Sequence, residues 1–144
     1  MRTAVLAVGM VILVTAVAAA QALPPFSVTR PYLKEADFTT AIQPYRAAIT
    51  ANARNAQAQY WLGFAHVVAY RQWLVGAAPY AGGYLARAVP PLQEAIKLEP
   101  ALINAYLALH DAYHLNGEFD KAEEIVTQMR AKTRPGWFPP IPSP

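Results

Sequence analysis

The sequence predicts an all-α fold in which antiparallel helix-turn-helix repeats stack into a short solenoid, and three observations support this. From residue 32 onward, alanine-rich segments carry apolar residues at the three- and four-residue spacing of an amphipathic helix. No segment alternates apolar and polar residues as a half-buried strand does. The segments also repeat, because Ala88 lies 34 residues before Ala122, Ala41 lies 47 before Ala88, and similar residues surround all three.

Hydrophobic spacing and turn residues place five helices along this part of the chain. The expected ranges, each joined to the next as an antiparallel hairpin, are 37–53, 56–74, 84–98, 101–115 and 119–132. The step of 47 residues is longer than the step of 34, which predicts an insertion at about residues 71–83. The second helix should therefore run past its usual end to about Leu74, and a glycine-rich loop should follow it.

Residues 100–125 resemble the tetratricopeptide (TPR) pattern, in which a large aromatic residue, a leucine and a tyrosine precede Gly-x-Tyr/Phe-x-x-Ala. The matching residues are Tyr106, Leu109, Tyr113, Gly117, Phe119 and Ala122, while His110 stands where the family has a small residue. The resemblance covers residues 32–133, as two repeats that follow the second helix of an earlier one. It implies that small residues such as Ala95 and Ala122 let helices approach closely, and that large ones fill the gaps between them, namely Phe38, Tyr45, Leu92, Tyr113 and Phe119.

The two ends of the predicted stack lack the helices that would cover them. Prolines prevent a first helix before residue 32, so residues 23–31 are interpreted as a proline-rich linker. At the other end no further helix follows an apolar stripe formed by Ala122, Ile125, Val126 and Met129. The proline-rich tail, residues 134–144, offers Trp137, Phe138 and Ile141 either as a cap over that stripe or as a contact with another subunit.

Residues 1–22 have the features of a secretory signal peptide. Arg2 precedes an apolar run from Val5 to Ala20, and small residues offer cleavage after Ala20 or Ala22. The alternative is an uncleaved membrane anchor, because a run of about 18 apolar residues just crosses a bilayer. In either case we expect the folded part outside the cytoplasm, periplasmic or secreted after cleavage and membrane-anchored without it. The chain has no cysteine, so helix packing alone must stabilise it.

The TPR resemblance implies a concave groove lined by the first helix of each repeat. The residues expected to face it are Gln57, Tyr60, Phe64 and Val67 in one repeat and Asn104, Leu107, Asp111 and His114 in the next. The Lys/Arg and Asn pairs with which some TPR domains bind a C-terminal carboxylate are absent, so the groove suits an apolar or proline-rich segment. The alternative is that Tyr60 and Phe64 are simply covered by other parts of the chain.

The predicted insertion adds apolar residues beyond the regular repeat. Trp73, Leu74, Val75 and Tyr80 are expected either to contact a partner or to fold back on the domain.

Composition and motifs argue against several other function classes. The net charge of +3 comes from scattered residues in no basic stripe, so nucleic acid is not an expected partner. His110 and His114 lie one helical turn apart, but two ligands are too few for a metal site. No nucleophile elbow, phosphate loop or metalloprotease motif occurs, so we expect no catalytic residues and no cofactor.

These observations together predict an exported, non-catalytic adaptor that binds another envelope or extracellular protein or a second copy of itself. The alternative is a structural subunit that is anchored by an uncleaved leader or self-associates. A membrane contact is expected only if the leader is retained.

Overall fold

The structure is a computed structural model that describes residues 22–133. In this range it contains helices and no strand, and the helices are α1 (Glu35–Ala51), α2 (Ala56–Leu74), α3 (Tyr84–Leu98), α4 (Ile103–Leu115) and α5 (Phe119–Lys132). The predicted all-α fold is therefore confirmed, and each helix begins and ends within about two residues of its expected range. The predicted tail contacts Trp137, Phe138 and Ile141, like the leader, lie outside the described residues.

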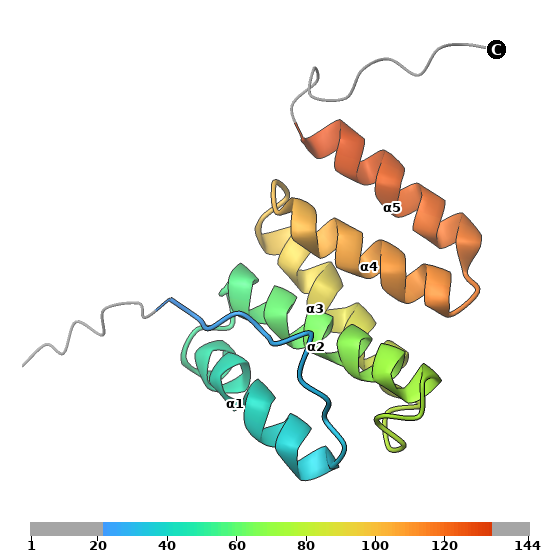
Figure 1. Ribbon diagram of the computed structural model, residues 1–144. Coiled ribbons are helices and arrows are strands. Elements are labelled where there is room, and N and C mark those ends of the chain that lie inside the picture. The colour runs from blue at the N-terminus through green and yellow to red at the C-terminus, as the bar shows by residue number, and fades with distance from the viewer. Residues whose placement is uncertain (1–21, 134–144) are drawn as a thin grey trace, which may run out of the picture.

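The helices form a stack in which each packs against the next along the chain (Figure 1). In addition α2 contacts α4, so these two helices lie next to each other across the repeat boundary. This arrangement is that of antiparallel helix pairs stacked into a short solenoid.

Left-handed glycines end two of the helices at the places where the chain must reverse. After α2, Gly76 has a φ of 77° and the amide of Ala77 donates to the carbonyl of Gln72 at 2.8 Å. After α4, Gly117 has a φ of 76° and the amide of Glu118 donates to the carbonyl of Tyr113 at 2.9 Å. Both are Schellman-type ends, in which a residue without a Cβ takes the left-handed conformation at no steric cost.

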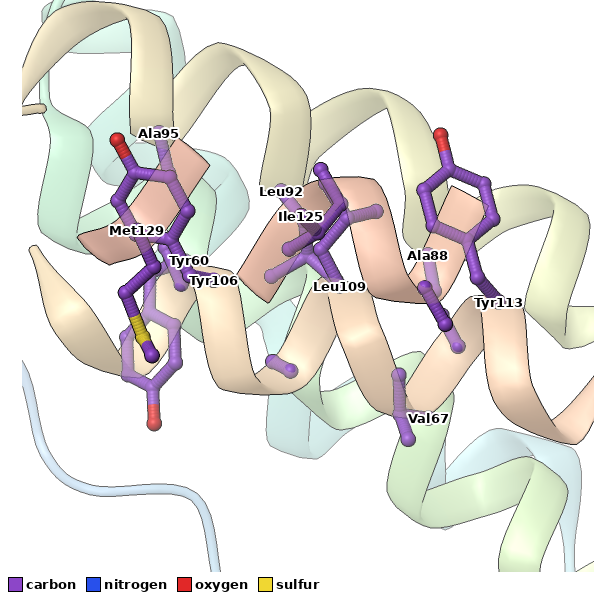
Figure 2. Packing of buried hydrophobic residues seen from close by; sticks show 14 of the residues in the cluster. Tyr60, Val67, Ala88, Leu92, Ala95, Tyr106, Leu109, Tyr113, Ile125 and Met129 are labelled. Atoms are coloured by element: carbon purple, nitrogen blue, oxygen red, sulfur yellow. The ribbon is translucent and has the colours of Figure 1, made fainter. Parts of the chain in front are cut away.

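The first of two core clusters joins α2, α3, α4 and α5. Figure 2 shows large side chains from these helices converging on small ones, and the cluster includes Tyr60, Ala88, Leu92, Ala95, Tyr106, Leu109, Tyr113, Ala122, Ile125 and Met129. The predicted role of Ala88, Ala95 and Ala122 as sites of close packing agrees with their near-complete burial.

The apolar stripe of α5 was expected to need a cover, and this expectation is wrong. Ala122, Ile125 and Met129 are buried within the first core cluster, because α5 turns this face toward the preceding helices. Its outer face is polar and exposed, as at Glu123 and Thr127. The last helix of the described range therefore presents a polar outer surface, as a capping repeat does.

Phe119 also differs from its prediction, because it does not fill a gap between helices. Its side chain is 60% exposed and lies edge-on to His114, with ring centroids 5.1 Å apart. The left-handed turn at Gly117 starts α5 at Phe119 itself, and at this first helical position the ring lies outside the core.

Residues 23–33, here called the strap, are part of the packed domain and not the linker that the sequence suggested. The strap carries no helix or strand, crosses α2, and then reaches the start of α1 (blue in Figure 1). Phe26 and Tyr32 are almost fully buried and belong to the second core cluster, with Phe38, Ile42 and Tyr45 of α1. The prolines do prevent a helix, but they do not prevent burial of the aromatic residues between them.

The strap occupies the position that the first helix of a complete repeat would take. In the predicted repeat register Phe38 and Tyr45 of α1 correspond to Leu85 and Leu92 of α3, which belong to the core that α3 shares with α2. No helix precedes α1 in the described range, and Phe26 packs on these two rings instead, at centroid distances of 6.1 Å and 6.4 Å. An extended segment thus buries the face of α1 that a helix would otherwise cover.

Candidate functional site

The insertion after Tyr70 holds the strap in place. α2 extends to Leu74, as predicted, and its added turns carry Gln72, whose side-chain oxygen accepts a hydrogen bond from the amide of Tyr32 at 2.9 Å. The nitrogen of the same side chain donates to the carbonyl of Arg30 at 2.8 Å. One glutamine therefore satisfies a donor and an acceptor of the strap backbone, as a neighbouring strand would.

Two tyrosine hydroxyls bind further carbonyl groups of the strap. Tyr45 donates to the carbonyl of Pro24 at 2.8 Å, and Tyr80 donates to the carbonyl of Tyr32 at 2.7 Å. Burial raises the pKa of both tyrosines to about 12, with smaller contributions from Tyr32 and, for Tyr80, from Glu35 and Asp37. Both hydroxyls therefore remain protonated donors at neutral pH.

The residues of the insertion that were predicted to contact a partner differ in how far they are buried. Tyr80 is half-buried against the second core cluster, so it is a support for the strap. Trp73 lies beside Tyr70 and so close to Gly82 that a Cβ added there would come within 3.1 Å of the indole. Leu74 is exposed, and the adjacent Val75 is 79% exposed.

A cleft of about 230 Å³ opens between the strap, α2 and α4. It is lined by Val28, Phe64, Val67, Val68, Arg71, Gln72, Val75 and Asp111. Val28 on the strap side is 56% exposed, so apolar surface flanks the cleft at both Val28 and Val75. We call Val28, Phe64 and Val75 the apolar rim.

An ion pair joins α2 and α4 at this cleft. Arg71 donates to a carboxylate oxygen of Asp111 at 2.7 Å, and both side chains remain partly exposed. Such an exposed pair contributes at most about 1 kcal/mol to stability. The pair places two charged groups beside the apolar rim.

The structure brings together only some of the residues that were predicted to line the groove. Phe64, Val67 and Asp111 line the cleft, although Val67 is itself buried and only forms part of its floor. Tyr60 is buried in the first core cluster, against Trp61 and Phe64, so the alternative of simple burial describes it better. The other predicted groove residues are exposed and do not line this cleft, namely Gln57, Asn104, Leu107 and His114.

The histidines do not form a metal site in the described range. His110 and His114 stack on the surface of α4 with ring centroids 5.9 Å apart. Among the residues that the structure describes, no three His, Cys, Asp or Glu side chains are grouped to hold a metal ion.

His66 is buried between α1, α2 and α3, and its protonation should destabilise the fold. Its Nδ1 donates to the carbonyl of Leu62 at 2.8 Å, since a carbonyl can only accept, and its ring packs on Phe38 and Tyr84. Burial lowers the pKa of His66 below its usual value. The Leu62 hydrogen bond opposes this effect in part, and the charges of Arg46 and Arg87 add smaller lowering effects.

We therefore expect stability to fall as the pH drops through about 6.5, the pKa of an unfolded histidine. Below this pH the unfolded chain binds a proton that the folded state excludes, and above it both states are neutral. Urea denaturation at pH 7.5 and 5.5 measures the change. His66→Gln should flatten the difference between the two pH values, whereas the exposed control His114→Gln should not; equal pH dependence in both variants would contradict this role.

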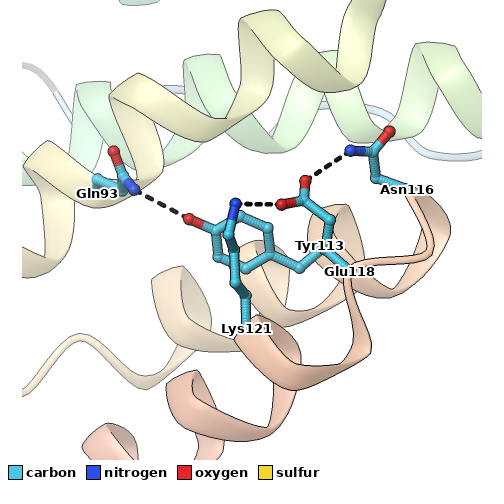
Figure 3. Close-up of polar contacts among 5 residues, drawn as sticks. All are labelled: Gln93, Tyr113, Asn116, Glu118 and Lys121. Carbon is cyan, nitrogen blue, oxygen red and sulfur yellow. Dashed lines mark hydrogen bonds and ion pairs between the residues drawn. The ribbon is translucent and has the colours of Figure 1, made fainter.

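A polar network ties the last helix pair to α3 (Figure 3). Gln93 donates to the hydroxyl of Tyr113 at 3.0 Å, Asn116 donates to Glu118 at 2.6 Å, and Lys121 pairs with the same carboxylate. Hydrogen bonds from Lys121 first, and from Asn116 second, lower the pKa of Glu118. The carboxylate of Glu118 is therefore ionised and already accepts hydrogen bonds. This arrangement suits a structural contact between the turn and α5 better than a group that transfers protons.

The fold and this cleft define a small helical-repeat stack with an apolar rim at the end of α2. No protein-family model matches the chain, and no curated protein matches it. In the part of the chain that the structure describes, no helix is both long and apolar enough to cross a membrane.

Proposed function

We propose that this chain is a non-catalytic TPR-type adaptor that binds another protein of a bacterial envelope or extracellular complex through the apolar rim. One observation carries this proposal: Val28 and Val75 are exposed at a cleft whose wall includes Phe64. Exposed apolar side chains gathered around a concave site, with polar groups at its edge, are typical of protein contacts. The repeat spacing of the sequence supports assignment to the TPR class.

The polar groups of the described residues support a binding role over an enzymatic one. Arg71 and Asp111 neutralise each other, and the carboxylate of Glu118 is occupied by Lys121 and Asn116. His66, the buried histidine, donates its Nδ1 proton to a backbone carbonyl inside the core. None of these groups is a free acid, base or nucleophile that lines an accessible cleft. A catalytic site requires such a group.

The proposed location outside the cytoplasm rests on the sequence of residues 1–22. Cleavage of this leader would release a periplasmic or secreted adaptor, whereas retention would give the alternative, a membrane-anchored structural subunit. N-terminal sequencing of the protein from its source separates the two. A chain that begins at Gln21 or Leu23 supports the adaptor, and one that retains Met1 supports the anchored subunit.

The binding surface is tested by co-purification from envelope extract with quantitative mass spectrometry. Val75→Asp should reduce the recovery of a specific partner about 10-fold or more, as expected when a central apolar contact receives a charge. Thr127→Asp, on the polar outer face of α5, is the matched control and should leave recovery unchanged. Equal recovery with both variants would exclude the apolar rim as the contact surface.

A further inference from the structure

The strap contacts the domain in the way that a bound peptide contacts its receptor. Phe26 is 5% exposed and Tyr32 is 2% exposed, and their rings stack on each other at a centroid distance of 5.0 Å. The prolines and the residues between these two anchors are exposed. Two buried aromatic anchors with a solvent-facing stretch between them are the usual basis of peptide recognition.

The strap backbone is held by side chains of the domain. Gln72, Tyr45 and Tyr80 make four hydrogen bonds to it, at the carbonyls of Pro24, Arg30 and Tyr32 and at the amide of Tyr32. Within the described residues, no backbone-to-backbone hydrogen bond joins residues 23–33 to a helix. These contacts require an extended main chain, and they do not depend on the side chains between the anchors.

We propose that α1, α2 and the loop at residues 77–83 form a binding site for an extended proline-containing peptide, which the strap fills as an intramolecular ligand. The ligand class follows from the two buried aromatic anchors, Phe26 and Tyr32, which lie six positions apart, and from the extended main chain between them. The exposed prolines contribute by keeping the segment extended. The occupant in trans is a partner segment with this chemistry. The two sites share residues, because Val28 of the apolar rim belongs to the strap and Gln72 lines the cleft. The exchange experiment below tests the strap site, whereas Val75→Asp tests the rim, so either proposal can fail without the other.

Prolines make such a segment a suitable ligand because they restrict the free chain to extended conformations. Less conformational entropy is then lost on binding, which is also how other proline-rich ligands use aromatic grooves. The strap is tethered directly to α1, and a short tether gives an effective concentration of about 1 mM or more. The strap therefore competes strongly with any partner segment, and only a segment with a high enough affinity or concentration can displace it.

The junction between strap and helix allows a direct test on the full chain. Leu33 and Lys34 are exposed, and neither is hydrogen-bonded to the site through its side chain. A flexible linker with one site for a sequence-specific protease is inserted between them, the protein is folded, and the linker is then cut. Size-exclusion chromatography, circular dichroism and mass spectrometry follow the strap fragment and the helical domain.

We expect the cut strap to co-elute with the folded domain and to exchange with an added synthetic peptide of residues 22–33. The same labelled peptide should bind the uncut chain at least about 100-fold more weakly, because the tethered strap occupies the site. A peptide with both Phe26→Ala and Tyr32→Ala should not exchange, and a scrambled peptide is the composition control. Gln72→Ala and Tyr45→Phe in the domain should each weaken binding about 3- to 10-fold, the range for loss of hydrogen bonds.

Three results would overturn the proposal. If the cut strap dissociates while the domain stays folded and binds no added peptide, the site does not bind extended peptides. If cutting unfolds the domain and excess peptide does not restore it, the strap is a core element and not a ligand. Equal exchange by the scrambled peptide would show that the contacts lack the stated specificity, and would also reject the ligand class.

Discussion

Phe26→Ala should lower the free energy of unfolding by about 3 to 5 kcal/mol, the usual cost of truncating a buried phenylalanine. The side chain is nearly inaccessible and contacts the rings of Tyr32, Phe38 and Tyr45, so its removal leaves a cavity where the strap covers α1. Chemical denaturation followed by circular dichroism measures the change.

Phe119→Ala is the matched control, because the same side chain is removed from an exposed position. Its expected effect is within about 0.5 kcal/mol, as for most surface substitutions. If the two variants have equal stability, the strap is not packed on α1 in solution, and the second core cluster would have to be rejected.

Gly63→Ala is expected to lower stability by about 1 to 3 kcal/mol, the range for overpacking a well-filled core. An added Cβ at Gly63 would lie 2.5 Å from Cγ of Leu92 and 2.9 Å from the carbonyl oxygen of Ala88. Leu92 is fully buried and the carbonyl belongs to the backbone of α3, so neither can move away easily. On an exposed helix surface the same substitution would stabilise the protein by about 1 kcal/mol. The expected change in stability at Gly63 is therefore opposite in sign to the change that helix propensity predicts.

Gly83→Ala provides the comparison, since a Cβ at that position meets no atom within 4 Å and its φ is −99°. This substitution should change the free energy of unfolding by at most about 1 kcal/mol, as for a glycine at a helix N-terminus. Thermal and urea denaturation of both variants decide the matter. Unchanged stability for Gly63→Ala would mean that α2 and α3 do not approach as closely as the structure has them.

The helices could be predicted because their signals are local. The repeated alanines and aromatic residues fix which face of each helix is apolar, and Gly76 and Gly117 mark where two helices end. The extension of α2 to Leu74 followed from the same comparison of repeat lengths.

The strap could not be predicted in this way, because its burial depends on contacts far away in the sequence. Prolines at 24, 25 and 31 indicate that the segment is not helical, but they do not indicate whether it packs. A signal was present, since flexible linkers rarely carry large aromatic residues, and Phe26 and Tyr32 lie among these prolines.

The candidate site was predicted only in part for a similar reason. Phe64, which the spacing along α2 suggested for a groove, lines the cleft, but the spacing could not show that Tyr60 is covered or that Val28 of the strap joins the apolar rim. The exposure of Val75 depends on where α2 ends and how Gly76 turns the chain, which residue spacing does not determine.

Site-specific photo-crosslinking in the source organism tests most directly whether the apolar rim binds another protein. A photoreactive amino acid replaces Val75 in one variant, Val28 in a second and Thr127 in a third, which probes the polar face of α5. Irradiation should give a discrete adduct of one partner protein at positions 75 and 28 and none at position 127. The absence of any adduct at positions 75 and 28, or the same adducts at all three positions, would contradict the proposed binding surface.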